Sequence, residues 1–333
     1  MPDPTTDAGP VTPASGDAPS ACPACGGPLA RWRNAPSGEP SLPGEVPLRR
    51  CVLCGTAVTG GPAPAFSAAH DAGSYATRRP RGAGAAAPLL AAFDRQRLRL
   101  VERHRPAGQR GRLLDVGAGR GRFVAAARAA GWDARGIEPS ARGVEAARAV
   151  YDVALERAMI DDAAVAPASL DAATLWHVLE HLDDPGAALA TIRDWLRPGA
   201  VLLVGVPNLG SWQARIGGRR WFHLDVPRHR VHLTPAGLRQ LAEDQGLQVL
   251  AVHQVLLEHN PFGMWQSLVN RLTGTTSHLF HVLKRAERPR PLALAVTLLA
   301  LPLVPLVAAV EALAGALGHG GTMALVARRP ADG

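Results

Sequence analysis

The sequence is poor in aromatic residues, and its positive charge comes almost entirely from one residue type. Aromatic side chains make up 5% of the 333 residues, and the net charge of +8 is carried almost wholly by arginine. These arginines are scattered along the chain, whereas a nucleic-acid-binding surface gathers them into one stripe with interleaved aromatic rings. The charge therefore does not indicate a nucleic-acid partner.

The chain also has no apolar run near its first residue. Residues 1–20 consist largely of Pro, Ala, Asp and Thr, which is typical of a disordered leader and not of a signal peptide. Since a protein without an export signal stays in a reducing compartment, we expect a cytoplasmic location.

Cysteine is scarce, but its spacing is informative. The sequence has four cysteines, in two C-x2-C pairs separated by 25 residues and each followed by glycine. The four are Cys22, Cys25, Cys51 and Cys54. This spacing predicts a zinc ribbon over residues 21–60, with two disulfides as the alternative. Four thiolates leave no open coordination position, so the zinc would be structural and not catalytic.

A phosphate-binding loop is absent, because no Gly-Lys-Ser or Gly-Lys-Thr occurs, but a different glycine-rich turn is present. A predicted strand from Arg112 to Val116 leads into this turn, and a second short strand from Ala134 to Ile137 ends at the acidic Glu138. The glycines are Gly117, Gly119 and Gly121. This order of strand, glycine turn, helix, strand and acid predicts a nucleoside site in which Glu138 binds the two ribose hydroxyls.

The acid that precedes the glycine turn favours a cationic ligand. Asp115 would repel a pyrophosphate but attract the sulfonium and ammonium groups of S-adenosylmethionine. An ordinary nucleotide site of the Rossmann type is the alternative.

Residues 113–123 resemble motif I of the class I S-adenosylmethionine-dependent methyltransferases, and the resemblance continues beyond them. Residues 174–185 resemble the segment after the fourth strand of that family, and 196–208 resemble its turn and fifth strand. Residues 221–235 are similar to those of the small-molecule branch near the ubiquinone-type O-methyltransferases. One departure is Ala200, where the family usually has a second glycine.

The resemblance implies an α/β fold with a Rossmann-like, seven-stranded, mostly parallel sheet. The expected strands are Arg112–Val116, Ala134–Ile137, Ala154–Leu155, Ala172–Trp176, Val201–Val206, Val249–Val255 and Thr322–Ala327. After the leader and the ribbon we expect a connector with an N-terminal helix over 61–110 and a methyltransferase core over 111–257. A hydrophobic helical insertion over 258–320 and a last strand with a tail over 321–333 complete the division.

The resemblance also implies the remaining site residues. Asp161 or Asp162 would face the adenine amino group, with an ordinary exposed loop as the alternative, and His177 is counted with the cofactor-binding residues. A hydroxyl acceptor needs a base, for which His181 is the first candidate and His229 the second. The alternative is that these histidines only line the pocket or cap a helix.

The segment from His177 to His181 also matches H-x-x-E-H, an inverted zinc-protease motif. Its position at the end of a parallel strand argues against proteolysis. Since some relatives bind a divalent metal near this position, Glu180 with His181 forms a second candidate metal site.

About sixty residues separate the last two predicted strands, which a tight hairpin normally joins. Within them, Pro291 to Leu317 contains one charged residue, Glu311, and approaches the length of a membrane span. A single crossing would leave the last strand on the far side of the bilayer. We therefore expect a re-entrant or surface-lying helical hairpin at the membrane, with a hydrophobic lid or dimer interface as the alternative.

These features predict an enzyme that transfers a methyl group from S-adenosylmethionine to a small-molecule or lipid-linked acceptor, most simply at a hydroxyl oxygen. A non-catalytic protein that binds a membrane or a partner through a vestigial nucleotide site is the alternative. A nucleic-acid methyltransferase is disfavoured because the Asn/Asp-Pro-Pro-Tyr/Phe signature is missing. The sequence specifies no oligomeric state.

Overall fold

A mixed sheet of six strands forms the centre of the molecule. The computed structural model describes residues 20–39, 42–61, 83–105, 110–276, 278–283 and 289–331. The strand order is β5-β4-β6-β7-β10-β9, in which β4, β5, β6 and β7 are parallel and β10 runs antiparallel to both of its neighbours. The strands are β4 (Arg112–Val116), β5 (Asp133–Ile137), β6 (Leu170–Trp176), β7 (Leu196–Pro207), β9 (Gln248–His253) and β10 (Thr322–Arg328).

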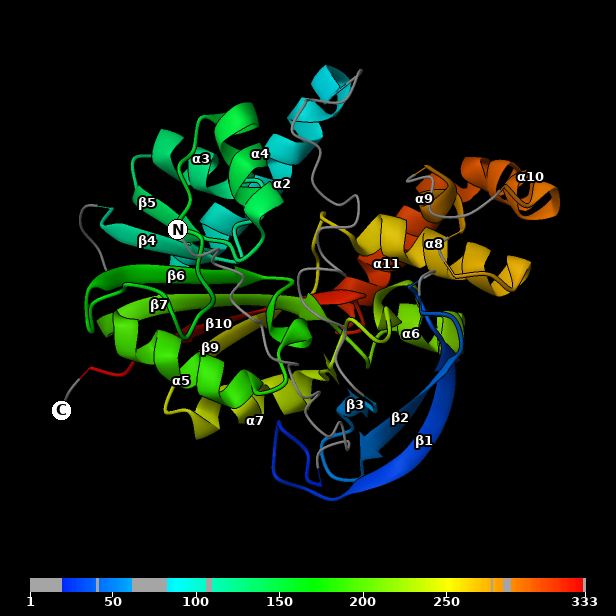
Figure 1. The fold of residues 1–333 in the computed structure, drawn as a ribbon, viewed down its shortest axis with the longest axis horizontal. Coiled ribbons are helices and arrows are strands. Elements are labelled where there is room, and N and C mark those ends of the chain that lie inside the picture. Colours follow the sequence, from blue (N-terminus) through cyan, green and yellow to red (C-terminus); the bar gives the residue numbers. More distant parts are fainter. Residues whose placement is uncertain are drawn as a thin grey trace, which may run out of the picture.

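Helices cover both faces of this sheet, as Figure 1 shows, with α2, α3 and α4 on one face and α5 and α7 on the other. The parallel strands are nearly continuous apolar runs because both of their faces are buried. The helix bounds are α2 (Ala83–His104), α3 (Arg122–Ala129), α4 (Ala141–Tyr151), α5 (Pro185–Trp195) and α7 (Pro235–Asp244). The caps follow the sequence, since Ser140, Asp184 and Thr234 each accept a hydrogen bond from the third residue beyond them.

The prediction of seven strands is wrong by one. Residues Ala154 and Leu155 form no strand, and only an isolated parallel bridge joins Ile137 to Glu156 at the outer edge of β5. Asp152 ends α4 in the left-handed conformation, at a φ of 55°. The extended stretch that follows is therefore too short to build a ladder beside β5.

The ribbon is not a separate unit, because it shares a sheet with the core. Its sheet has four antiparallel strands in the order β1-β2-β3-β8. Their bounds are β1 (Leu29–Pro36), β2 (Glu45–Cys51), β3 (Ala57–Thr59) and β8 (Val231–His232). This strand β8 belongs to the loop that follows β7. The N-terminal module is thereby fixed against the histidine-rich part of the chain.

The long connection between β9 and β10 is helical. It contains α8 (Asn260–Thr273), α9 (His278–Leu283), α10 (Pro291–Ala300) and α11 (Val304–Ala316), and it packs beside α6 (Trp212–Gly217). In place of the expected hairpin, residues Pro291–Ala316 form one helical run with a single 3-10 turn at Leu301–Leu303. Figure 1 places this insertion beside the sheet and next to the ribbon.

Candidate active site

The glycine turn after β4 is arranged around the carboxylate of Glu138. The amide of Gly119 donates to Oε2 of Glu138 at 2.8 Å, and the amide of Ser140 donates to Oε1 at 3.0 Å. Gly117 and Gly119 have φ angles of 71° and 55°, which an L-residue rarely adopts. The structure thus brings the predicted glycine turn and acid together at the carboxyl ends of β4 and β5, where open α/β sheets bind ligands.

Asp115 is buried at the end of β4 beneath this turn. Its Oδ1 accepts a hydrogen bond of 2.6 Å from the hydroxyl of Thr174 on the neighbouring β6. Burial raises the pKa of the Asp115 carboxyl to about 6, although the nearby Arg97 acts in the opposite direction. A cationic ligand at this site would favour the ionised carboxylate.

A buried ion-pair network that sequence reasoning missed lies beside Asp115. Glu258, just after β9, forms ion pairs with Arg97 and Arg122. Its Oε2 lies 2.6 Å from Nη2 of Arg97, and its Oε1 lies 2.8 Å from Nη2 of Arg122. Arg122 also pairs with Asp94, with 3.1 Å between Nη1 and Oδ2. Burial alone would raise the pKa of Glu258, but the arginines outweigh it and lower that pKa. The signal in the sequence was the position of Asp94 and Arg97 on the otherwise apolar inner stripe of α2, between Leu90 and Val101.

His177 follows β6 directly and faces the beginning of the insertion. Its φ of 56° is in the left-handed region, and its Nδ1 lies 2.9 Å from Oε1 of Glu180. The ring of His177 contacts those of His223 and His259, with centroid distances of 5.9 and 4.6 Å. Burial lowers the pKa of His177 to about 4, so at neutral pH the contact with Glu180 is a hydrogen bond and not an ion pair.

His223 and His259 are further residues that sequence reasoning missed. His223 is buried, whereas the side chain of His259 is 43% exposed. Burial lowers the pKa of His223 well below its ordinary value, and the neighbouring groups also lower the pKa of His259. They come from the loop after α6 and from the segment before α8, so only the tertiary fold brings them to His177. The positive φ of His259, 66°, is a further local strain at this place.

The two candidate bases, His181 and His229, lie side by side. Their ring centroids are 4.6 Å apart. The Nδ1 of His181 donates to the carbonyl of Arg228 at 3.2 Å, and the Nδ1 of His229 donates to the carbonyl of His223 at 2.8 Å. In both rings, therefore, Nδ1 carries a proton.

Glu180 completes a compact group with these two histidines. One ligand atom from each of Glu180, His181 and His229 lies within 4.8 Å of the others. Glu180 is buried, burial raises its pKa to about 7, and its Oε2 has no hydrogen-bond partner among the described residues. His177 belongs to the other histidine group, so the two histidines of H-x-x-E-H point to different partners and do not form the protease site.

Asp161 and Asp162 lie in an exposed turn that follows the bridge between Ile137 and Glu156. Within the described part of the chain the turn is held by the amide of Asp162, which donates to the carbonyl of Met159 at 3.3 Å. The structure therefore places neither carboxylate in contact with the glycine turn, and a role toward adenine stays a prediction.

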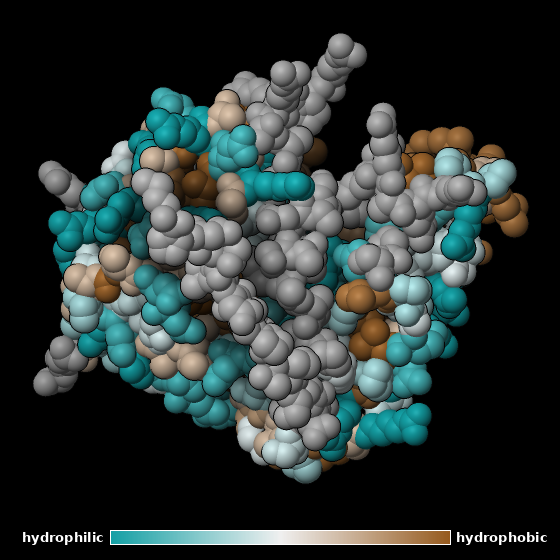
Figure 2. Space-filling model, viewed as in Figure 1, coloured by the Kyte–Doolittle hydropathy of each residue, from teal (hydrophilic) through white to brown (hydrophobic). Residues whose placement is uncertain are grey.

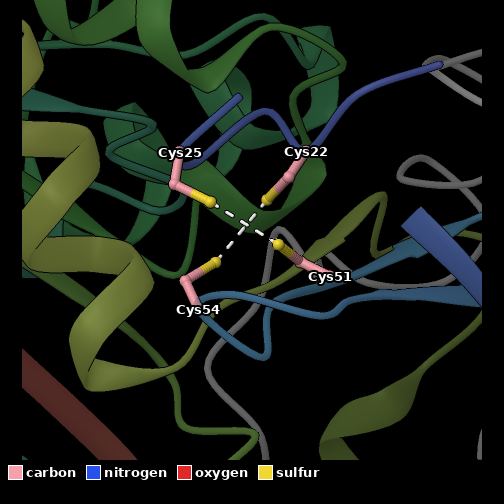
Figure 3. A group of neighbouring side chains, drawn as sticks. All are labelled: Cys22, Cys25, Cys51 and Cys54. Atoms are coloured by element: carbon pink, nitrogen blue, oxygen red, sulfur yellow. Dashed lines mark hydrogen bonds between the residues drawn. The ribbon is translucent and has the colours of Figure 1, made fainter. Parts of the chain in front are cut away.

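The four cysteines converge on one point from two turns, as Figure 3 shows. Two Sγ–Sγ distances are 3.6 Å (Cys22 to Cys54) and 3.5 Å (Cys25 to Cys51), and all four sulfurs lie within 4.8 Å of one another. Four sulfurs at about 2.3 Å from a tetrahedral zinc would be about 3.8 Å apart, so the cluster fits that ion. The cysteines are free thiols in the structure, which contradicts the disulfide alternative.

The ribbon supports the histidine-rich loop directly. The hydroxyl of Thr59 on β3 donates to the carbonyl of His229 at 2.6 Å and lies 2.9 Å from Nε2 of His232. The hydroxyl of Thr234 donates to the carbonyl of Cys54 at 2.7 Å. Displacement of the ribbon would therefore displace His229.

Comparison with known proteins gives consistent matches. The profile of a methyltransferase-domain family matches residues 87–252. A ubiquinone biosynthesis O-methyltransferase of Thiobacillus denitrificans is 29% identical over 165 residues, which cover 46% of this chain and 70% of the relative.

Two solved structures of S-adenosylmethionine-dependent methyltransferases are also similar. The one from Thermotoga maritima is 18% identical, covers 72% of this chain and 91% of its own, and has a TM-score of 0.44. The one from Archaeoglobus fulgidus is 16% identical, covers 72% and 93%, and has a TM-score of 0.46.

Proposed function

Since this chain is a member of the S-adenosylmethionine-dependent methyltransferases, we propose that it methylates a hydroxyl oxygen of a small-molecule or lipid-linked acceptor. The cofactor supplies an electrophilic methyl group on a sulfonium sulfur. Asp115, Gly117, Gly119, Gly121 and Glu138 hold it, and His177 borders it.

One contact carries the proposal, because it joins the cofactor turn to the histidine segment. A Cβ added to Gly117 would lie 2.4 Å from Cγ2 of Val178, so the backbone of the turn packs directly against the segment that carries His177 and His181. An acceptor bound by the histidines would lie within reach of a methyl group held above Gly117. Methyl transfer depends mainly on such positioning of the two reactants.

The state of the histidines supports a hydroxyl acceptor. With Nδ1 donating to a carbonyl, Nε2 of His181 or His229 would remove the hydroxyl proton as the oxygen–carbon bond forms and the sulfur–carbon bond breaks. We assign His181 as the base and His229 as its partner or substitute. The low pKa of the buried His177 keeps that ring uncharged, and this suits a neutral acceptor.

A divalent metal ion at Glu180, His181 and His229 is a second candidate, supported by the convergence of their ligand atoms. In that case the ion would lower the pKa of the acceptor hydroxyl, and the histidines would be ligands. Activity that survives exhaustive chelation would support the histidine base. Activity lost on chelation and restored by Mg²⁺ or Zn²⁺ would support the metal.

We further propose that the cysteine cluster binds a structural zinc ion and that the enzyme is cytoplasmic and associated with the membrane surface. The closed set of four thiolates supports a structural role. The non-catalytic alternative has less support, because Asp115, the glycine turn and Glu138 form an intact site.

The test is to incubate the purified protein with methyl-labelled S-adenosylmethionine and host extract, and then to partition the products between organic and aqueous phases. Label in the organic phase that Asp115→Asn abolishes would support an enzyme with a lipid-linked acceptor, and label in the aqueous phase a small polar one. Label no greater than that of Asp115→Asn in both phases would favour the non-catalytic alternative. Leu89→Ser, an exposed change on α2, is the matched control.

A further inference from the structure

The helical run Pro291–Ala316 exposes its large apolar side chains and buries its polar ones, which is the reverse of a surface helix on a soluble protein. Apart from Val307, its inward residues are small or polar, namely Ala293, Thr297 and Ala300 on α10 and Glu311 and Ala314 on α11. Its large side chains point outward, and Leu292 and Leu299 are each 79% exposed. A soluble surface helix buries its large apolar residues and exposes its polar ones. Figure 2 shows the resulting brown surface over α10, at the upper right.

The outward face of this run offers no hydrogen-bonding side chain. Its two polar residues are both buried: Thr297 donates to the carbonyl of Ala293, and Glu311 accepts from the amide of Gly321 at 2.6 Å. Protein–protein interfaces, including those of obligate dimers, combine an apolar centre with polar groups and hydrogen bonds. A face that is apolar throughout fits the hydrocarbon of a lipid layer better than the surface of a second copy.

The topology determines how this face can meet a membrane. The chain leaves the central sheet at β9 and returns to it at β10, which pairs with β9 over its length. The outgoing helix α8 buries Asn260, Gln266 and Asn270 and is not a second apolar span. Although Pro291–Ala316 is long and apolar enough to cross a bilayer, a crossing would separate β9 from β10. The run must therefore lie in the interface plane.

Basic residues lie at the start of this run. The sequence from Lys284 to Arg290 contains four basic residues and one acidic residue, a net charge of +3, and Arg290 is exposed directly before α10. Positive charge beside an apolar helix adds attraction to anionic headgroups.

We propose that the outward face of Pro291–Ala316 inserts among the lipids of an anionic membrane and attaches the enzyme to it as a monotopic anchor. The inner helix α8 joins this anchor to the active site. It starts at Asn260 next to His259, and the indole nitrogen of Trp265 donates to the carbonyl of Ala300 at 2.9 Å. The histidine group is thereby held at the base of the membrane-bound segment. The binding itself needs neither cofactor nor catalysis.

The experiment is flotation of the full-length protein with phosphatidylcholine vesicles, with and without anionic phosphatidylglycerol. The test variant is Leu292→Ser with Leu299→Ser, because both side chains point away from the protein and their loss leaves the packing on α8 intact. The matched control is Val52→Ser with Leu89→Ser, two exposed apolar residues outside the insertion. Thermal unfolding of each variant tests whether it is folded.

We expect the parent protein and the control to float, more strongly with phosphatidylglycerol, and the test variant to partition at least about ten-fold more weakly. Two results would overturn the proposal. One is a parent protein that stays with the soluble fraction, and the other is a folded test variant that floats like the parent. If a parent that does not float is dimeric and its test variant is monomeric, the outward face is a subunit interface.

Discussion

At the scale of single residues, the charge of Asp115 is the feature that we propose controls cofactor binding. The carboxyl is buried, and its pKa of about 6 lies above its ordinary value of 3.8. The cofactor-free folded state therefore retains a proton that the unfolded chain loses between these two pH values. The stabilising contribution of this proton is complete at low pH and is lost as pH rises through about 6. A cationic cofactor has the opposite preference, since it binds the ionised carboxylate.

Cofactor affinity is accordingly predicted to rise with pH. Between pH 5 and pH 7 the ionised fraction of a carboxyl with a pKa near 6 increases about ten-fold, so the dissociation constant of S-adenosylmethionine should fall by a similar factor. Titration calorimetry across this range measures it. Asp115→Asn should bind more weakly and without this pH dependence. A parent affinity that is constant from pH 5 to pH 7 would contradict the role of Asp115.

The two candidate bases should affect catalysis and not cofactor binding. We expect His181→Ala to lower kcat by about 100-fold or more, and His229→Ala to lower it by a smaller factor, because a positioned base contributes in this range. The dissociation constant of S-adenosylmethionine should stay unchanged in both. His104→Ala, at the far end of α2, is the control. If both variants retained full kcat, neither histidine would be the base, and both would only line the pocket.

At the scale of elements, the strands and caps around the proposed cofactor site were predictable because their signals are local. Asp115, the glycines and Glu138 follow one another along a single strand–turn–helix–strand segment, and the fold brings Glu138 to the glycine turn. Their binding of the cofactor stays a prediction. His223 and His259 were not predictable in this way, because they meet His177 only when the insertion folds against the sheet. The prediction of a third strand at Ala154–Leu155 was wrong because the short segment after Asp152 forms only one isolated bridge, between Glu156 and Ile137.

The ribbon was predicted from its cysteines, but its attachment to β8 was not. Strand β8 has only two residues and no pattern of its own, so its pairing with β3 depends on the tertiary fold. This pairing connects the predicted zinc site, through Thr59, to His229, the second proposed base.

Loss of the ribbon's metal site should therefore reduce turnover while cofactor binding is retained. We expect Cys51→Ser with Cys54→Ser to remove bound zinc and lower kcat by about ten- to 100-fold, because small displacements of catalytic groups have effects of this size. Metal content and steady-state kinetics measure the two effects, with Val52→Ser as the control between the same cysteines. Full kcat in a zinc-free, folded variant would show that the ribbon does not position His229.

At the scale of the whole molecule, three parts converge on one place. The sheet supplies the cofactor turn, the ribbon holds the loop with His229, and the insertion contributes Glu258 and His259. Glu258 joins the insertion to α2 through Arg97 and to α3 through Arg122. A movement of the insertion would therefore shift these two helices beside the proposed cofactor site. The composition of the apolar run was plain in the sequence, but its inverted packing became visible only in the fold.

We propose that methyl transfer from S-adenosylmethionine occurs at a hydroxyl oxygen beside the histidines. The most direct measurement uses ¹³C-methyl-labelled S-adenosylmethionine with acceptor-containing extract and detects the product by NMR. We expect a methyl ether signal that is absent with Asp115→Asn and strongly reduced with His181→Ala. A label on nitrogen or carbon, or equal ether formation by the parent and Asp115→Asn, would contradict it.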